Sequence, residues 1–112
     1  MIASTYEVKA REAATPVLVQ AIEPVPGLHV YHQPDELRGP GDDSHPWRPG
    51  HHSGYAMAAF ATQAEATYAA HAVAEFADWT RSAEELRGDP DFDLTGYYDR
   101  LMERTYGLLI AA

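Results

Sequence analysis

Histidine is the residue type in this sequence whose clustering could do chemistry. Three of the six histidines, His45, His51 and His52, lie in the short segment SHPWRPGHHSGY, directly after Asp42 and Asp43. Neutral imidazole and carboxylate are good ligands for zinc and other divalent transition metals, and a loop can bring such groups together. The segment therefore predicts a candidate metal site at His45, His51 and His52, although the spacing matches no established metal signature.

The adjacency of His51 and His52 argues against a shared site. Successive side chains of a strand point to opposite faces, so the two rings would diverge if this segment is extended. The alternative interpretation is that these histidines are surface residues or make hydrogen bonds within the protein. In that case the chain needs no metal or other cofactor.

No arrangement of residues predicts a catalytic centre. The segment GHHSG is superficially similar to a nucleophile elbow, but Ser53 stands one position too late and fits a tight turn better. Asp89, Asp91 and Asp93 have the alternate spacing that opens a calcium loop, but Pro90 interrupts them and the later glycine and glutamate are missing. The chain has no cysteine, which removes thiolate nucleophiles. We therefore expect a protein that binds and does not catalyse.

Composition limits the partners of such a binding protein. The 112 residues include 17 acidic and 8 basic side chains, a formal net charge of −9. Direct binding to nucleic acid or to an anionic membrane needs clustered lysine and arginine, and is not expected. The sequence has neither an apolar stretch of about 20 residues nor a secretory signal, which predicts no membrane span and a cytoplasmic location. The length suits a single domain, residues 1–112.

The acidic residues concentrate in the second half of the chain. Residues 56–112 hold ten acidic and four basic side chains, whereas residues 1–55 hold seven and four. This half therefore predicts a binding surface for a protein partner, with a basic partner as one form of the hypothesis. The adjacent tyrosines near the end cannot both face one core, so one of them is expected to contact a partner or a second copy in a homodimer. The candidate partner-binding residues are Glu84, Glu85, Asp89, Asp91, Asp93, Tyr97 and Tyr98.

The first half of the chain has the pattern of strands. Residues 16–23 are apolar and β-branched, the PVPG segment that follows is typical of a turn, and residues 28–32 return as a second strand. Residues 34–50 are rich in proline and glycine and predict a loop-rich segment. Residues 48–52 and 55–60 then predict a second hairpin around the Ser53–Gly54 turn.

The second half has the pattern of helices. Thr62 and Glu65 form a capping box that begins an alanine-rich helix running to about Ala77. Ser82 and Glu85 repeat this signal for a short helix. A last helix begins near Asp91 or Asp93 and carries an apolar stripe as far as Leu108, with Gly107 either ending it or only weakening it. Strands followed by helices favour an α+β fold. We expect a small antiparallel sheet of three to four strands in two hairpins, packed by the alanine-rich helix, followed by a short and a C-terminal helix.

Two resemblances accompany this prediction. The segments SGYAMAAFAT and ADWTRSAEEL are similar to a pattern in small uncharacterised actinobacterial proteins, some of them on mobile or phage-like elements, and this resemblance implies no particular activity. A strand that ends in Phe60-Ala61-Thr62 before an alanine-rich helix also resembles the arm-binding domains of integrases. That resemblance implies DNA binding through the sheet, but those domains are basic there and this chain is acidic.

Three hypotheses therefore remain. The leading one is a non-enzymatic binding or regulatory module that acts on a protein partner. The first alternative is a metal- or small-ligand-binding protein that uses the loop histidines, with a divalent transition metal as its cofactor. The second alternative is a DNA-binding domain.

Overall fold

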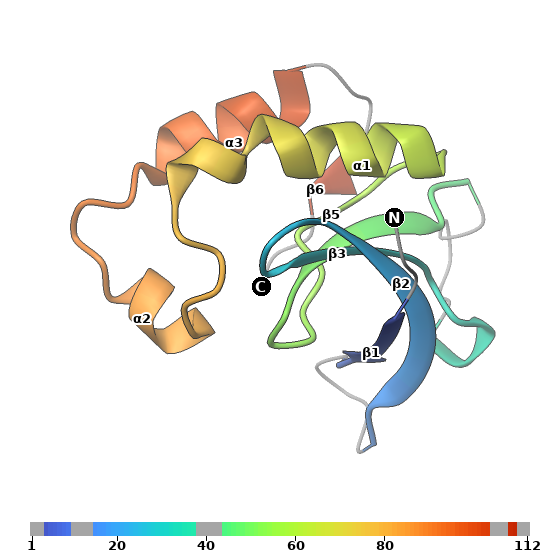
Figure 1. Ribbon diagram of the computed structural model, residues 1–112. Helices are drawn as coiled ribbons and strands as arrows, with labels where there is room; N and C mark the ends of the chain where they lie inside the picture. Colours follow the sequence, from blue (N-terminus) through green and yellow to red (C-terminus); the bar gives the residue numbers. More distant parts are fainter. Residues whose placement is uncertain (1–3, 10–14, 38–43, 104–107, 110–112) are drawn as a thin grey trace.

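The computed structural model describes residues 4–9, 15–37, 44–103 and 108–109. These residues form an antiparallel sheet with helices above it (Figure 1). Among them, no helix is long and apolar enough to cross a bilayer. The elements in chain order are β1 (Ser4–Val8), β2 (Val17–Val25), β3 (Leu28–His32), a 3-10 helix (Asp35–Leu37), β4 (Trp47–His51), β5 (Ala58–Ala59), α1 (Gln63–Ala72), a 3-10 helix (Ala74–Phe76), α2 (Ala83–Arg87), α3 (Leu94–Glu103) and β6 (Leu108–Leu109).

The main sheet has the strand order β1-β2-β3-β4 with antiparallel pairing throughout. The predicted hairpin of β2 and β3 is confirmed, with the turn closed where Val25 pairs with Leu28. The pairing shifts between Ile22 and Val25, around Pro24, which has no N–H to donate to the ladder. β5 and β6 form a separate two-stranded sheet.

Two strands differ from the sequence prediction. β1 was not predicted, and it pairs along its whole length with β2. β4 confirms the strand predicted over residues 48–52 to within one residue, but it begins at Trp47 and so overlaps the segment 34–50 that was predicted to be loop-rich. Pro49 and Gly50 are unfavourable in strands, so the sequence signal for this strand is weak. In the structure the carbonyl of Pro49 accepts a hydrogen bond from the Met57 N–H, and Gly50 bridges to Ala56. The loop prediction therefore extended too far.

The alanine-rich helix covers one face of the sheet, as predicted (Figure 1). Thr62 caps its start by accepting from the Glu65 backbone N–H. The helix ends at Ala72, five residues before the predicted end, and continues as a 3-10 turn. The buried side chains between helix and sheet include Leu28, Val30, Phe60, Ala66, Ala69, Ala70 and Val73.

The last helix is also shorter than predicted. α3 spans Leu94–Glu103, and Leu108–Leu109 form β6, which pairs with β5 instead of continuing the helix. The α+β class and the order of a sheet, an alanine-rich helix, a short helix and a third helix are confirmed. On the opposite face of the sheet a smaller cluster contains Tyr6 and Tyr31, and the Tyr6 hydroxyl donates to the carbonyl of His51 at the end of β4.

Gly27 in the β2–β3 turn fits a position that other residues cannot occupy. Its φ is +89°, and a Cβ there would overlap the backbone carbonyl of Trp79. Its own N–H donates to the Glu23 carboxylate (2.9 Å), and its carbonyl accepts from the backbone N–H of His52 (2.9 Å). The turn therefore lies directly against the segment that carries Trp79.

We predict that Gly27→Ala lowers the free energy of unfolding by about 2 kcal/mol or more, because the substitution combines an unfavourable φ with a backbone overlap. Gly88→Ala is the matched control. The φ of Gly88 is −86°, and a Cβ there would lie 3.4 Å from the carbonyl oxygen of Glu84, an ordinary contact. Urea unfolding of both variants measures the difference, and equal stabilities would contradict the role assigned to Gly27.

Candidate functional site

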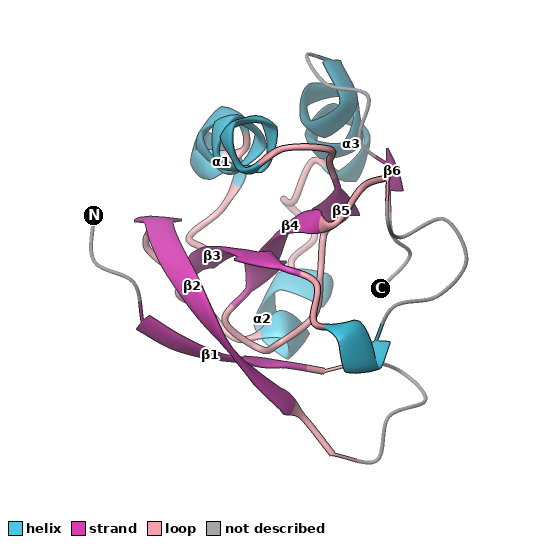
Figure 2. Cartoon of the chain, turned by 90° about the vertical axis from the view of Figure 1, so that its right-hand side faces the viewer, coloured by secondary structure: helices cyan, strands magenta, loops and turns pink. Residues whose placement is uncertain are grey.

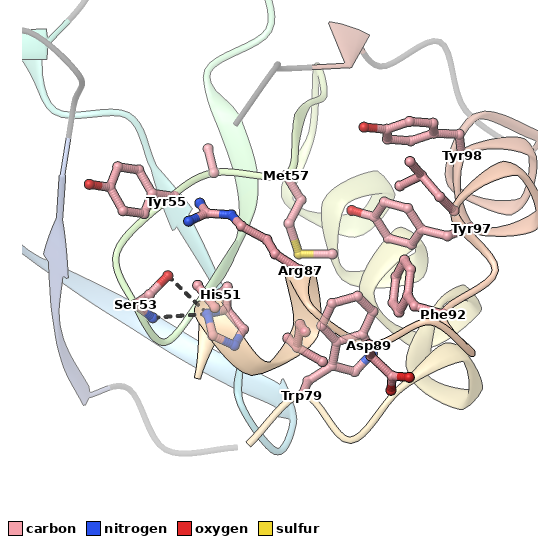
Figure 3. Close-up of a pocket in the computed structure, with 14 residues that line it drawn as sticks. His51, Ser53, Tyr55, Met57, Trp79, Arg87, Asp89, Phe92, Tyr97 and Tyr98 are labelled. Atoms are coloured by element: carbon pink, nitrogen blue, oxygen red, sulfur yellow. Dashed lines mark hydrogen bonds between the residues drawn. The ribbon is translucent and has the colours of Figure 1, made fainter. Parts of the chain in front are cut away.

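A pocket of about 460 Å³ lies between the end of the main sheet and the two C-terminal helices (Figure 3). One side comes from the end of β4 and the segment after it, and the other from Trp79, α2 and α3. Figure 2 shows β4, α2 and α3 from the side that faces right in Figure 1. The residues on which its chemistry depends are His51, Tyr55, Met57, Trp79, Arg87 and Tyr97.

Three aromatic rings form one continuous wall of this pocket. The centroid of the Trp79 ring lies 5.9 Å from that of Phe92 and 5.6 Å from that of Tyr97, and the Phe92 and Tyr97 centroids are 5.6 Å apart. The indole N–H of Trp79 donates to the carbonyl of Val73 (3.0 Å), so its one polar atom is already satisfied. Because the rings pack on one another, they leave no cage between them for a cation, but they offer an apolar surface.

The mouth of the pocket is also apolar. Tyr55, Leu94 and Tyr98 line it, with 37%, 52% and 39% of their surface exposed. They are three of the five large apolar side chains that are exposed in the described part of the chain. Tyr97 is 7% exposed and belongs to the core, whereas Tyr98 is the exposed member of the pair.

His51 lies at the inner end of β4 with both ring nitrogens in hydrogen bonds. Nε2 lies 2.9 Å from the carbonyl oxygen of Arg81, and since a carbonyl only accepts, Nε2 carries the proton. Nδ1 then accepts from the backbone N–H of Ser53 (3.2 Å) and from its hydroxyl (2.9 Å). Burial, reinforced by the neighbouring His52, lowers the pKa of His51, so its ring is neutral near pH 7.

The order Ser53 hydroxyl, His51 ring, Arg81 carbonyl is also the order of groups around an activated serine nucleophile. However, the N–H of Ser53 points to His51 Nδ1, and an acyl-transfer site would need such a donor aimed at the substrate oxygen. Only His52 lies between the two partners in the sequence, so they belong to one turn. We therefore interpret these contacts as those that fix the turn after β4.

The three histidines of the predicted metal site are not brought together as ligands. Nδ1 of His45 pairs with the hydroxyl of Ser44 (2.9 Å). The rings of His51 and His52 lie 4.1 Å apart, and Nε2 of each is within 2.9 Å of the Arg81 carbonyl. Within the described ranges, no group of three or more histidine, cysteine, aspartate or glutamate side chains is placed to hold a metal. The prediction that His51 and His52 diverge was wrong, because β4 ends at His51 and His52 already belongs to the turn.

Arg81 holds two of the predicted partner-binding acids. Its guanidinium donates to the Asp89 carboxylate (2.9 Å) and lies 3.6 Å from that of Glu85. Glu85 also accepts from Ser82 in a capping box, which confirms the predicted start of α2. Hydrogen bonds from the Asp91 N–H and from Arg81 lower the pKa of Asp89.

A third predicted acid also has a structural partner, because Asp93 accepts from the backbone N–H of Gly96 at the start of α3. Two of the five acids, Glu84 and Asp91, have side chains that make no hydrogen bond or ion pair with described residues. The acidic surface that remains available to a partner is therefore smaller than the sequence suggested. Of the seven predicted partner-binding residues, the pocket contains Asp89, Tyr97 and Tyr98.

Arg87 is the charged residue of the site that sequence reasoning missed. Its side chain lines the pocket, and Figure 3 shows its guanidinium extending toward Tyr55, away from Asp89. It forms no ion pair with a carboxylate among the described residues. In the sequence Arg87 resembles an ordinary basic residue in the last turn of a short helix, so only the position of α2 identifies it.

No known protein-family model, curated protein or solved structure matches this chain. The geometry of the site combines an aromatic wall, an apolar mouth, a neutral histidine and one arginine with no carboxylate partner in the described structure.

We predict that the stability of the protein falls as the pH is lowered from about 7.5 to 5.5. The lowered pKa of His51 means that the unfolded chain, with its ordinary histidine pKa near 6.5, binds the proton more readily than the folded protein. The contribution of His51 to the free energy of unfolding is complete above the pKa of the unfolded chain. It is lost as the pH falls from there through the lower pKa of the folded protein. Burial also lowers the pKa of His29, so His51→Gln should reduce this pH dependence without abolishing it.

Urea unfolding at several pH values measures this dependence. His45→Gln is the control, since that ring contacts only the neighbouring Ser44 among the hydrogen bonds described above. The same pH dependence in wild type and His51→Gln would show that His51 is not held neutral by the fold.

Proposed function

We propose that this protein is a binding module without catalytic activity that takes a small, predominantly apolar ligand into the pocket beside α2 and α3. One observation carries the proposal. Most of the large apolar side chains that are exposed in the described structure gather at the mouth of a single hollow whose wall is a buried aromatic cluster. Exposed apolar groups cost free energy in water, and their concentration at a cavity is typical of a binding site.

The dimensions and lining of the pocket support this proposal. Small-molecule sites generally measure about 300–1,000 Å³ and combine apolar walls with a few polar groups. The pocket of about 460 Å³ falls in this range, and its polar groups come from a few residues, among them Arg87 and the tyrosines.

The condition of the polar side chains supports binding in preference to catalysis. His51 uses both ring nitrogens in hydrogen bonds inside the protein, so neither is available to move a proton to or from a ligand. Asp89 is held by Arg81 and by the N–H of Asp91. The two groups best suited to acid–base chemistry thus serve to hold the pocket together.

The test is saturable binding of the neutral fluorescent probe N-phenylnaphthylamine. Ala83 lines the pocket as the first residue of α2, so Ala83→Leu should fill part of it. We expect this variant to bind the probe about tenfold more weakly, a loss of roughly 1.4 kcal/mol in binding free energy. Ala64→Leu is the matched control, because Ala64 is an exposed residue near the start of α1 and does not line the pocket.

Absence of saturable binding by the wild-type protein would contradict the proposal. Equal affinity in Ala83→Leu and Ala64→Leu would also contradict it, because the probe would then bind elsewhere. Circular dichroism of each variant establishes that the comparison is made between folded proteins.

A protein partner of basic charge is the second candidate. It is favoured by the exposed ring of Tyr98 and by the carboxylates of Glu84 and Asp91, which have no partner among the described residues. A partner of this kind would insert an apolar side chain into the pocket and place lysine or arginine near the acids.

The two candidates differ in their response to charge. A short peptide with tryptophan between lysines should displace the probe, and should do so better at low salt than the same peptide with glutamates. Equal displacement by both peptides, or by neither, would contradict a basic partner. Tyr98→Ala should weaken binding of the lysine peptide. Tyr68→Ala changes another exposed tyrosine, outside the pocket, and should leave the affinity for this peptide unchanged.

A further inference from the structure

We propose that Arg87 makes the pocket selective for an aromatic carboxylate, whose ring lies on the Trp79–Phe92–Tyr97 wall while its carboxylate pairs with the guanidinium. This inference rests on the proposed function, and it adds the charge and chemical class of the ligand. A planar guanidinium presents paired N–H donors that match the two oxygens of a carboxylate.

Comparison with two other arginines distinguishes Arg87. The guanidinium of Arg81 is held by Asp89 and Glu85, and Arg100 pairs with Glu75 (2.9 Å). Arg87 has no such carboxylate in the described part of the structure. Of these three side chains, Arg87 is also the one that lines the pocket.

Arg87 is an exposed residue at the lining of the pocket, and the other charged side chains of the lining leave its guanidinium available to a ligand. Asp89 is the carboxylate that lines the same cavity, but its charge is compensated by Arg81 at 2.9 Å. His51 is neutral near pH 7, so it neither repels nor competes for a bound anion. The ligand therefore meets one uncompensated positive charge.

The net charge of −9 opposes an anion, but chiefly at long range. At physiological ionic strength the interaction of exposed charges is screened beyond about 8 Å. A carboxylate in direct contact with Arg87 lies well inside that distance, so the local pairing outweighs the repulsion from acids elsewhere on the surface.

The wall of the pocket accounts for the aromatic part of the ligand. Trp79, Phe92 and Tyr97 have centroids within 6 Å of one another and form a broad apolar surface. Rings in ligands pack well against such surfaces in offset or edge-on arrangements. Figure 3 shows this wall and the Arg87 side chain bordering the same hollow, with the guanidinium turned toward Tyr55. The inferred ligand therefore carries its carboxylate at the end of the ring system that points away from the wall.

Naphthoate and naphthamide form a matched pair of ligands for the test, since they share the ring system and differ in the charge of the substituent. Each is used to displace N-phenylnaphthylamine from the full-length protein. We expect naphthoate to bind about five- to tenfold tighter than naphthamide, as is reasonable for one charge-assisted contact.

Substitutions of Arg87 identify the source of this preference. Arg87→Gln should remove the preference for naphthoate, measured within the variant as the ratio of the naphthoate and naphthamide affinities, so that any change in general binding to the pocket cancels. Arg87→Lys should retain part of it, because the charge remains but the paired donors are lost. Arg100→Gln removes one positive charge outside the pocket and should leave the preference unchanged.

The outcomes separate this inference from the proposed function. If the probe binds and responds to Ala83→Leu, but naphthoate and naphthamide compete equally, the pocket remains a binding site and the role of Arg87 is wrong. An unchanged preference in Arg87→Gln would also overturn it. If the probe does not bind at all, the proposed function itself fails.

Discussion

The two sides of the pocket are joined through Arg81. Its backbone carbonyl accepts hydrogen bonds from the rings of His51 and His52 at the end of β4, and its guanidinium holds Asp89 and Glu85 beyond it. A single residue thus connects the end of the sheet with α2 and the segment leading to α3. The His51 ring can accept from Ser53 at Nδ1 while donating to Arg81 at Nε2 only when it is neutral. Burial favours this neutral form because it lowers the pKa of the ring. This set of contacts therefore ties together the two sides between which the cavity lies.

The elements that the sequence predicted well are those encoded by neighbouring residues. Thr62 with Glu65, and Ser82 with Glu85, identify helix starts because capping is a contact over three residues. The hairpin of β2 and β3 follows from its turn and its apolar pattern. β4 was only partly predicted, because Pro49 and Gly50 break that pattern and the strand is specified by pairing with β3 and by bridges to Ala56 and Phe60.

The pocket itself could not be predicted from local patterns. His51 and Tyr98 were singled out in the sequence, but for a metal site and a partner contact respectively. What joins them is the packing of α2 and α3 against the end of β4, which depends on Arg81 and on the close approach of Gly27 to Trp79. The acids illustrate the same limit, because their number was clear from composition whereas their engagement in caps and ion pairs was not. Arg87 gains its importance only from this three-dimensional context.

The position of Trp79 has a spectroscopic consequence. The chain contains two tryptophans, and Trp79 is the one that forms a wall of the pocket. Its indole is 6% exposed and borders the space that a ligand would occupy, so its emission responds to the polarity and contents of that space. Trp47 lies on β4 beside His32, in a different environment. The protein thus carries a native fluorophore at the proposed binding site, and its emission offers a way to follow occupancy without attaching a label.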